Sequence, residues 1–157
     1  MATFYSLSIK TIHRETSKAV SISFNVPEEL KDIFRFQAGQ YLTLKAKIDG
    51  QDVRRDYSIS ASPSSGDLTV TIKEIENGLF SSFANQDLKV GGVLEVAPPN
   101  GRFVFISHSD PQNTVVAFAA GSGITPIMSI LKTVLESSDT QKFVLVYGNK
   151  TPKDTIF

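Results

Sequence analysis

The sequence of 157 residues contains no cysteine. This absence excludes a disulfide framework, a thiolate zinc site and a cysteine-ligated iron–sulfur cluster within the chain. Histidine is almost as scarce: His13 and His108 have no second plausible ligand near them in the sequence, so each is interpreted as a surface residue and no metal site is expected. Any redox chemistry must therefore use a bound cofactor.

An excess of charge of one sign is lacking as well. The 16 basic and 16 acidic residues cancel, and no Lys/Arg cluster is longer than Arg54-Arg55. Because a surface that follows nucleic-acid phosphates needs a basic patch, nucleic acid is not an expected partner. The longest strongly apolar stretch, Val115 to Ala120, is too short to span a bilayer, and the polar N-terminus does not open a signal peptide. The protein is expected in the cytoplasm, with no membrane partner.

Short β-like segments fill the first two thirds of the chain. Hydrophobic residues make up 41% and charged residues 20%, which is typical of a globular domain. Asp49-Gly50 is the strongest hairpin signal, since both residues tolerate the positive φ of a tight turn. Many short strands separated by such turns favour a closed antiparallel barrel. The expected strands are Tyr5–Ile12, Ala19–Phe24, Tyr41–Ile48, Arg55–Ser60 and Leu68–Ile75.

One helix is expected to interrupt the barrel after Gly78, beginning at Ser81 or Ser82. After Pro111 the pattern changes to an apolar strand, a glycine turn and an amphipathic helix, in which Thr125 is expected to be the cap and Pro126 the first helical residue.

A second apolar strand, Lys142–Tyr147, completes a βαβ unit. A two-stranded parallel sheet with one helix cannot bury both faces, so this unit is expected to be the start of a larger domain and the chain a piece of a longer protein. The expected boundaries are a barrel at 1–106, a linker at 107–113 and the βαβ unit at 114–157.

Three segments have compositions suited to a ligand. Arg55-Asp56-Tyr57-Ser58 offers a guanidinium fork for phosphate, an aromatic face and a hydroxyl, although an ordinary strand would also fit. Gly78-Leu79-Phe80-Ser81 is either an anion site at a helix start or a plain N-cap. The segment from Gly121 to Pro126, between strand and helix, is either a nucleotide site or a tight turn.

Taken in order, the motifs resemble those of the ferredoxin–NADP reductase superfamily. They are Arg55-x-Tyr57-Ser58, Gly78-x-x-Ser81, Pro99-x-Gly101-x-Phe103, Gly121-x-Gly123-Ile124-Thr125-Pro126 and Tyr147-Gly148-Asn149-Lys150. The resemblance implies an all-β antiparallel Greek-key FAD-binding barrel followed by the first βαβ unit of an incomplete α/β nicotinamide-binding domain. Within the superfamily, the segments at 39–45, 54–59 and 94–99 resemble reductases of the oxygenase systems that degrade phenylacetate.

The resemblance also implies residue roles. Arg55 would bind the FAD pyrophosphate, Tyr57 would stack on the isoalloxazine, and Ser58 would hydrogen-bond near flavin N5. Tyr57, Ser58 and Thr125 would be the catalytic residues. The set implied for FAD is Arg55, Asp56, Tyr57, Ser58, Ile72, Lys73, Gly78, Phe80, Ser81 and Thr125, with Ile72 and Lys73 acting mainly through the backbone. The set implied for NAD(P)H is Gly121, Ser122, Gly123, Ile124, Pro126, Tyr147, Gly148 and Asn149.

The implied activity is an NAD(P)H-dependent FAD oxidoreductase that passes single electrons to an iron–sulfur centre. That centre would lie in a missing ferredoxin domain or in an oxygenase partner, since this chain has no cysteine. The remaining strands of the nicotinamide domain are absent too, so full activity is expected of the longer parent protein. Lys150 is a candidate for recognising the NADP phosphate, but a solvated loop lysine fits equally well. The alternative is a non-catalytic flavin-binding or protein-interaction barrel.

Overall fold

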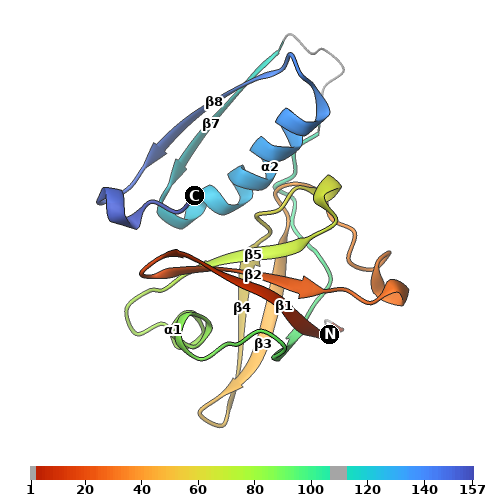
Figure 1. Cartoon of the computed structure of the whole chain (residues 1–157), viewed down its shortest axis with the longest axis vertical. Helices are drawn as coiled ribbons and strands as arrows, with labels where there is room; N and C mark the ends of the chain where they lie inside the picture. The colour runs from red at the N-terminus through yellow and green to blue at the C-terminus, as the bar shows by residue number, and fades with distance from the viewer. Residues whose placement is uncertain (1–2, 107–112) are drawn as a thin grey trace.

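A computed structural model describes residues 3–106 and 113–157. The expected linker at 107–113 lies outside these ranges except for its last residue. The described chain has two parts, a barrel below and a smaller α/β unit above it (Figure 1). Among the described residues, no helix combines the length and apolar character needed to cross a membrane.

Six antiparallel strands form the barrel, in the sheet order β4-β3-β6-β1-β2-β5. Neighbours in this order are often not consecutive in sequence, as in a Greek key. The two end strands approach each other through an antiparallel bridge between Ile59 and Val70, which closes the sheet. The expected barrel is thus confirmed. Its strands are β1 (Tyr5–Thr16), β2 (Ala19–Asn25), β3 (Tyr41–Ile48), β4 (Gln51–Ser58), β5 (Leu68–Lys73) and β6 (Val93–Val96).

The hairpin between β3 and β4 has the predicted turn. Asp49 and Gly50 have φ angles of 48° and 79°, and Ile48 pairs with Gln51 across them. Because pairing continues to the turn, β4 begins four residues before the expected Arg55. The short strand β6 was not among the five expected strands, although it lies between β1 and β3 in the sheet.

Alternating side chains of the strands fill the barrel with aliphatic groups. The largest completely covered ones in the barrel are Leu7, Ile9, Val20, Ile22, Leu42, Leu44, Ile59, Val70 and Ile72, together with Phe80 from α1. Closure of the sheet therefore buries one face of nearly every strand.

The helix inside the barrel sequence, α1 (Leu79–Gln86), begins earlier than expected. Gly78 is its N-cap, and no side chain caps it. The prediction that Ser81 or Ser82 starts the helix is wrong because Ser81 lies within the first turn, where its Oγ donates to the Gly78 carbonyl at 3.1 Å.

The second part consists of β7 (Thr114–Ala120), α2 (Ile124–Ser137) and β8 (Lys142–Gly148), with short 3-10 turns at Gly121–Gly123 and Pro152–Asp154. The two strands pair in parallel, so the βαβ prediction is confirmed. Thr125 is not the cap: the helix begins at Ile124, and the Thr125 Oγ1 donates backward to the Ser122 carbonyl at 3.0 Å. Pro126 is accordingly the third helical residue rather than the first.

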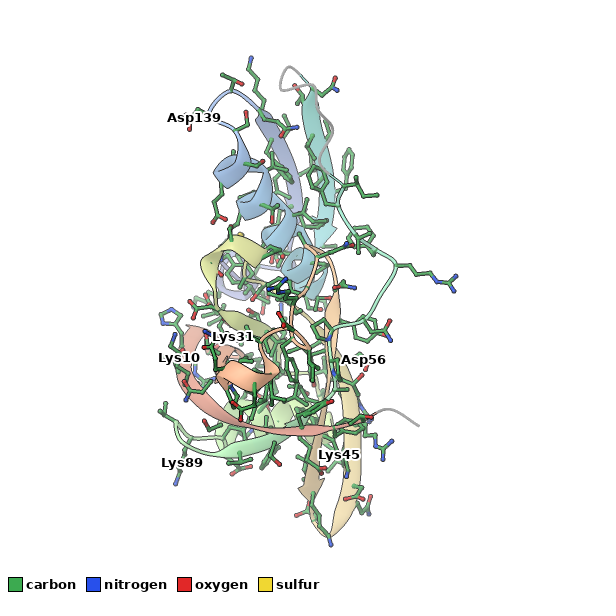
Figure 2. The ribbon with its side chains drawn as sticks, turned by 90° about the vertical axis from the view of Figure 1, so that its right-hand side faces the viewer. Lys10, Lys31, Lys45, Asp56, Lys89 and Asp139 are labelled. Atoms are coloured by element: carbon green, nitrogen blue, oxygen red, sulfur yellow. The ribbon has the colours of Figure 1, made fainter. Side chains whose placement is uncertain are left out.

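Helix α2 lies between the two-stranded sheet and the barrel (Figure 1). Its apolar face forms a second core cluster in which Ile124, Ile127, Ile130 and Val134 pack with residues of both parts, including Ala19 of β2. The two parts are stacked end to end, with Asp139 near one end and Lys45 toward the other (Figure 2). Figure 2 also shows Asp56 on the barrel side of the junction. Helix α2 therefore packs against both the barrel and the two-stranded sheet.

Candidate functional site

A pocket of about 530 Å³ lies where the barrel meets the turn before α2. It receives side chains from β4, from the end of β5, from the start of α1 and from the glycine turn. Its lining consists of Arg55, Asp56, Tyr57, Ser58, Thr71, Lys73, Ile75, Asn77, Gly78, Leu79, Phe80, Ser81, Ser122, Gly123, Thr125 and Pro126. Residues far apart in sequence, predicted separately, thus surround one space, which we call the junction pocket.

Arg55 carries a charge that the described residues do not neutralise with a carboxylate. Its Nη1 donates to the backbone carbonyl of Arg54 at 2.7 Å, and the side chain is exposed. The adjacent Asp56 points to the neighbouring strand, where it accepts a 2.6 Å hydrogen bond from the Thr43 hydroxyl. The guanidinium fork is therefore open toward an anion such as a phosphate.

Tyr57 places an aromatic ring in the wall of the pocket. Its ring centroid lies 5.6 Å from that of Phe80 at an interplanar angle of 41°, and Phe80 is buried behind it. Burial raises the pKa of Tyr57 to about 12, while the positive charge of Arg55 acts in the opposite direction. The phenol therefore stays protonated at neutral pH and can donate a hydrogen bond.

The loop before α1 is tightly folded around Gly78. A Cβ added at Gly78 would lie 2.3 Å from the Ser81 Oγ and 3.0 Å from the Ile75 carbonyl oxygen, so only glycine fits. The Ser81 hydroxyl also accepts from the Ile75 N–H at 3.2 Å. Since Ser81 holds the loop together, the anion-binding groups available here are the first N–H groups of α1.

Strand β5 presents alternate residues to the pocket. Thr71 and Lys73 line it, and the Lys73 Nζ donates to the Asp154 carbonyl at 3.1 Å. Ile72 between them is completely buried, and its carbonyl already accepts from the Asn85 amide at 3.2 Å. Ile72, which was expected to act mainly through its backbone, does not line the pocket, and Thr71, which was not expected, does; the period of two along a strand predicts this difference between the side chains.

The glycine turn forms the opposite wall. Gly121 has a φ of 50°, which favours glycine, and a Cβ added at Gly123 would meet no atom within 4 Å. The backbone at Gly123 therefore leaves room for a ligand to approach closely. Ser122, Thr125 and Pro126 complete this wall, whereas Ile124 is completely buried.

Residues predicted at the end of β8 lie beside the glycine turn and outside the pocket lining. The Tyr147 hydroxyl donates to the Gly121 carbonyl at 3.0 Å. Gly148 ends the strand, and Asn149 follows it. The Asn149 Oδ1 is buried and has no hydrogen-bond partner among the described residues, so it is an unpaired acceptor just after the end of β8.

The donors around the junction pocket suit a flavin dinucleotide. Arg55 and the α1 terminus favour phosphate, Tyr57 offers a ring, and Ser58 and Thr125 offer hydroxyls. No three His, Cys, Asp or Glu side chains of the described segments gather as metal ligands. Ile75, Asn77 and Leu79 were not expected in the site, and they line the pocket because the loop before α1 folds back on itself.

Comparisons with family models assign the barrel residues of the pocket and its glycine turn to two different domains. The model described as the oxidoreductase FAD-binding domain matches residues 6–105, and the one described as the oxidoreductase NAD-binding domain matches residues 118–157. The first contains the β4, β5 and α1 residues of the pocket, and the second contains the glycine turn.

Two curated relatives cover almost the whole chain. It is 43% identical over 157 residues to a subunit of the 1,2-phenylacetyl-CoA epoxidase of Escherichia coli (strain K12), covering 100% of this chain and 44% of that protein. It is 39% identical over 153 residues to the ferredoxin reductase component of the 3-ketosteroid-9-alpha-monooxygenase of Rhodococcus rhodochrous, covering 96% of this chain and 42% of that protein. The chain thus spans less than half the length of either relative.

Solved structures share the fold at low sequence identity. The flavohem-like FAD/NAD-binding domain of the nitric oxide dioxygenase from Vibrio cholerae O1 biovar El Tor has a TM-score of 0.83 at 22% identity, over 97% of this chain and 65% of that one. The ferredoxin-NADP+ reductase of Plasmodium falciparum has a TM-score of 0.82 at 20% identity, over 99% and 65%. The domain matches show that the chain belongs to the family of oxidoreductases with FAD- and NAD-binding domains, and its fold is that of a ferredoxin-NADP+ reductase.

Proposed function

We propose that the junction pocket binds FAD and that the chain is the flavin-binding part of an NAD(P)H-dependent electron-transfer reductase. The flavin would accept a hydride from NAD(P)H and release electrons singly to an iron–sulfur centre in another domain or partner. The observation that carries this proposal is that residues 55–58, 78–81, 122, 123, 125 and 126 line one pocket.

Each wall has a separate task in this proposal. Arg55 and the first turn of α1 bind the pyrophosphate, and the Tyr57 ring stacks on the isoalloxazine. Ser58 hydrogen-bonds near flavin N5, and Thr125 faces the ring from the glycine turn. The turn itself receives the nicotinamide nucleotide, with Asn149 as a further acceptor. The protein contributes orientation and exclusion of water, while the cofactors supply the redox chemistry.

The relatives support an oxygenase as the final destination of the electrons. One is named as a subunit of a phenylacetyl-CoA epoxidase and the other as the reductase component of a monooxygenase. We infer from the first that this chain serves an oxygenase of phenylacetate degradation in the cytoplasm. A plant-type ferredoxin domain or an oxygenase component would be its partner.

The proposal is tested by adding FAD, with FMN as the control, to the purified chain and recording the visible spectrum. We expect FAD to bind in preference to FMN, and NADH or NADPH to bleach the bound flavin under anaerobic conditions. If neither flavin binds, the assignment of the junction pocket is wrong. If FAD binds but neither nucleotide reduces it, the same test on a longer protein that contains a complete NAD-binding domain decides: failure there too would make the chain part of a flavin carrier, which is the non-catalytic alternative.

The acceptor is tested separately, with the reduced flavoprotein and a plant-type [2Fe–2S] ferredoxin. Electron transfer to the ferredoxin would appear as return of the oxidised flavin spectrum. If the ferredoxin does not reoxidise the flavin but purified epoxidase components do, the electron acceptor lies in the oxygenase partner and not in a ferredoxin domain of the reductase.

A further inference from the structure

A single buried hydroxyl joins α2 to the barrel. Ser129 is completely covered, and its Oγ donates a 2.6 Å hydrogen bond to the carbonyl of Ala61, itself nearly buried. Serine inside a helix commonly bonds to its own helix or faces water. Here the hydroxyl lies on the apolar face with Ile127 and Ile130 and bonds to a different element. The hydrogen bond between Ser129 and Ala61 therefore forms only when α2 lies in this position against the barrel.

Two further side chains of α2 contact the same barrel segment. The Lys132 Nζ donates to the Ser60 carbonyl at 3.4 Å, and the Glu136 carboxylate accepts from the Ser64 hydroxyl. Hydrogen bonds from Ser62 and Ser64 lower the pKa of Glu136. Residues at this spacing lie along one side of a helix. Lys132 and Glu136 are both exposed, so Ser129 is the contact that water competes with least.

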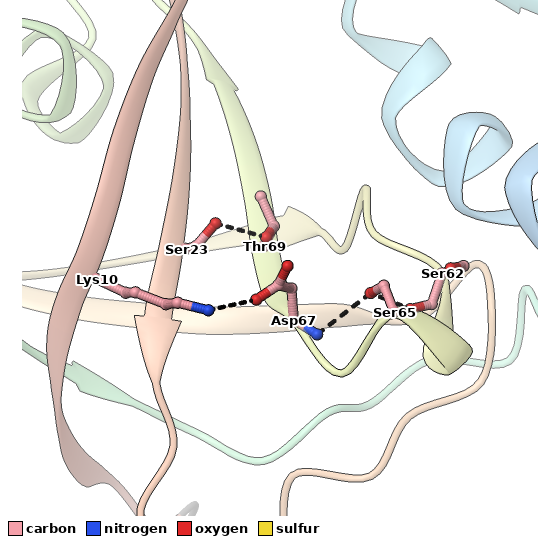
Figure 3. A network of polar contacts seen from close by, with 6 residues as sticks. All are labelled: Lys10, Ser23, Ser62, Ser65, Asp67 and Thr69. Carbon is pink, nitrogen blue, oxygen red and sulfur yellow. Dashed lines mark hydrogen bonds and ion pairs between the residues drawn. The ribbon is translucent and has the colours of Figure 1, made fainter.

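The barrel segment that receives α2 is held firmly from its other side. Figure 3 shows the Lys10 Nζ on Asp67 at 2.8 Å, and the Asp67 N–H on the Ser65 Oγ at 3.2 Å. The Ser65 hydroxyl in turn donates to the Ser62 carbonyl at 2.7 Å. These contacts link the segment at 62–67 to β1 through Lys10 and to itself through Ser65.

The same two elements carry opposite walls of the junction pocket. Ala61 follows Ser58 by three residues, and Ser129 follows Thr125 by four, which is about one helical turn or 6 Å. A displacement of α2 at Ser129 would therefore reach Thr125 and the glycine turn almost undiminished. Misplacing reactants by about 1 Å can slow a reaction by about 10²-fold, so even a small displacement of Thr125 would lower the rate of flavin reduction.

We propose that Ser129 is a positioning residue, whose hydrogen bond to Ala61 sets the place of the nicotinamide turn relative to the flavin wall. The inference rests on the proposed function for its catalytic consequence, but its structural part does not. Ser129 touches neither cofactor in this proposal; it acts through the helix that carries Thr125.

The structural part is tested on the chain without ligands by hydrogen–deuterium exchange. Ser129→Ala removes the donor and leaves the Ala61 carbonyl without it, so backbone amides of 121–130 should exchange several-fold faster. Ser129→Cys replaces the hydroxyl with a somewhat larger thiol, which is a weaker donor, and should fall between Ala and the parent. Ser137→Ala is the matched control, because its hydroxyl donates to Val134 within the same helix at 3.0 Å. Unchanged exchange in both Ser129 variants would overturn the inference.

The functional part is tested by anaerobic reduction of the bound flavin. We expect Ser129→Ala to lower the limiting reduction rate about tenfold, with FAD affinity and the half-saturating NAD(P)H concentration unchanged, and Ser129→Cys to recover part of it. An unchanged limiting rate, or a loss explained by weaker FAD binding, rejects the positioning role. If the chain binds FAD but is reduced neither alone nor within a longer protein that contains a complete NAD-binding domain, the proposed function fails, while the exchange experiment still decides whether Ser129 fixes the helix.

Discussion

The two parts of this chain apply the same side-chain alternation with different results. In the barrel, closure of the sheet gives each inward residue a neighbour, and Ile22 and Leu44 are completely buried. In the β7–β8 pair, α2 covers one face, while Val116 and Phe118 on the other remain 54% and 74% exposed. Parallel sheets are usually covered on both faces. An apolar pattern thus predicts a strand, whereas burial depends on which element packs against it.

The sharpest test of this difference compares Ile22→Ala with Phe118→Ala. The first removes a completely buried side chain and leaves a cavity, so it should reduce the free energy of unfolding by about 2 to 5 kcal/mol. The second trims a largely exposed ring and should change it by less than about 0.5 kcal/mol. Urea unfolding followed by circular dichroism measures both.

Leu44→Ala serves as a second buried site, on a different strand of the barrel. If Phe118→Ala were as destabilising as the two barrel variants, the exposed face of the β7–β8 pair would have to be covered in solution. That outcome would break the contrast between the two parts.

Much of the local structure of the two parts could be predicted from the sequence, because turns and strands leave local patterns. The Asp49-Gly50 turn and the strand–turn–helix around Gly121 were both predicted, since Asp49, Gly50 and Gly121 adopt positive φ angles that few residue types tolerate. Strand β6 was missed, because four residues carry little periodicity and its pairing with β1 and β3 is long-range. The early starts of α1 and α2 were missed because Ser81 and Thr125 bond backward to carbonyls instead of capping.

The second prediction concerns the barrel wall of the junction pocket. Arg55→Ala should weaken FAD binding by about 1.5 to 3 kcal/mol, the usual value of a hydrogen bond to a charged group. Arg54→Ala is the matched control: it is adjacent on β4 but its guanidinium lies 5.0 Å from the Phe4 ring centroid, away from the pocket lining. Fluorescence titration with FAD measures both affinities.

Equal losses in the two arginine variants would point to a general effect of charge and remove Arg55 from a specific role. A loss confined to Arg55 would show that strand alternation separates a ligand-binding side chain from a structural one within two residues.

A third prediction concerns a buried polar network on the face of β5 opposite to the core residues Val70 and Ile72. The buried Thr71 hydroxyl lies 2.8 Å from both the Ser21 and Ser60 hydroxyls, and Ser21 donates to Glu15 at 2.6 Å. Thr71→Val should cost about 1 to 2 kcal/mol of unfolding free energy, because it leaves buried hydroxyls with fewer partners. Thermal or urea unfolding measures this cost.

Thr69→Val is the control for Thr71, since its hydroxyl pairs with Ser23 at 2.7 Å in a partly exposed position on the same strand. Its cost should be smaller, because water can replace the lost partner. A larger cost for Thr69 would mean that the buried network contributes less than the more exposed pair.

The last prediction concerns Tyr57, where the two parts meet. Its pKa is raised from 10.0 to about 12, with burial as the main cause, so the unfolded chain ionises first as pH rises. Stability from the protonated phenol is complete below about pH 10 and is lost as pH rises toward 12. Tyr57→Phe, which cannot ionise, should therefore lose less stability than the parent over that interval. Ultraviolet titration of phenolate in the two proteins isolates the Tyr57 step, and a midpoint near 10 would mean that the ring is more hydrated than its place against Phe80 implies.

Since α2 and its turn form the opposite wall of the pocket, the same titration in Ser129→Ala reports whether displacing α2 lets water reach the Tyr57 ring in the barrel.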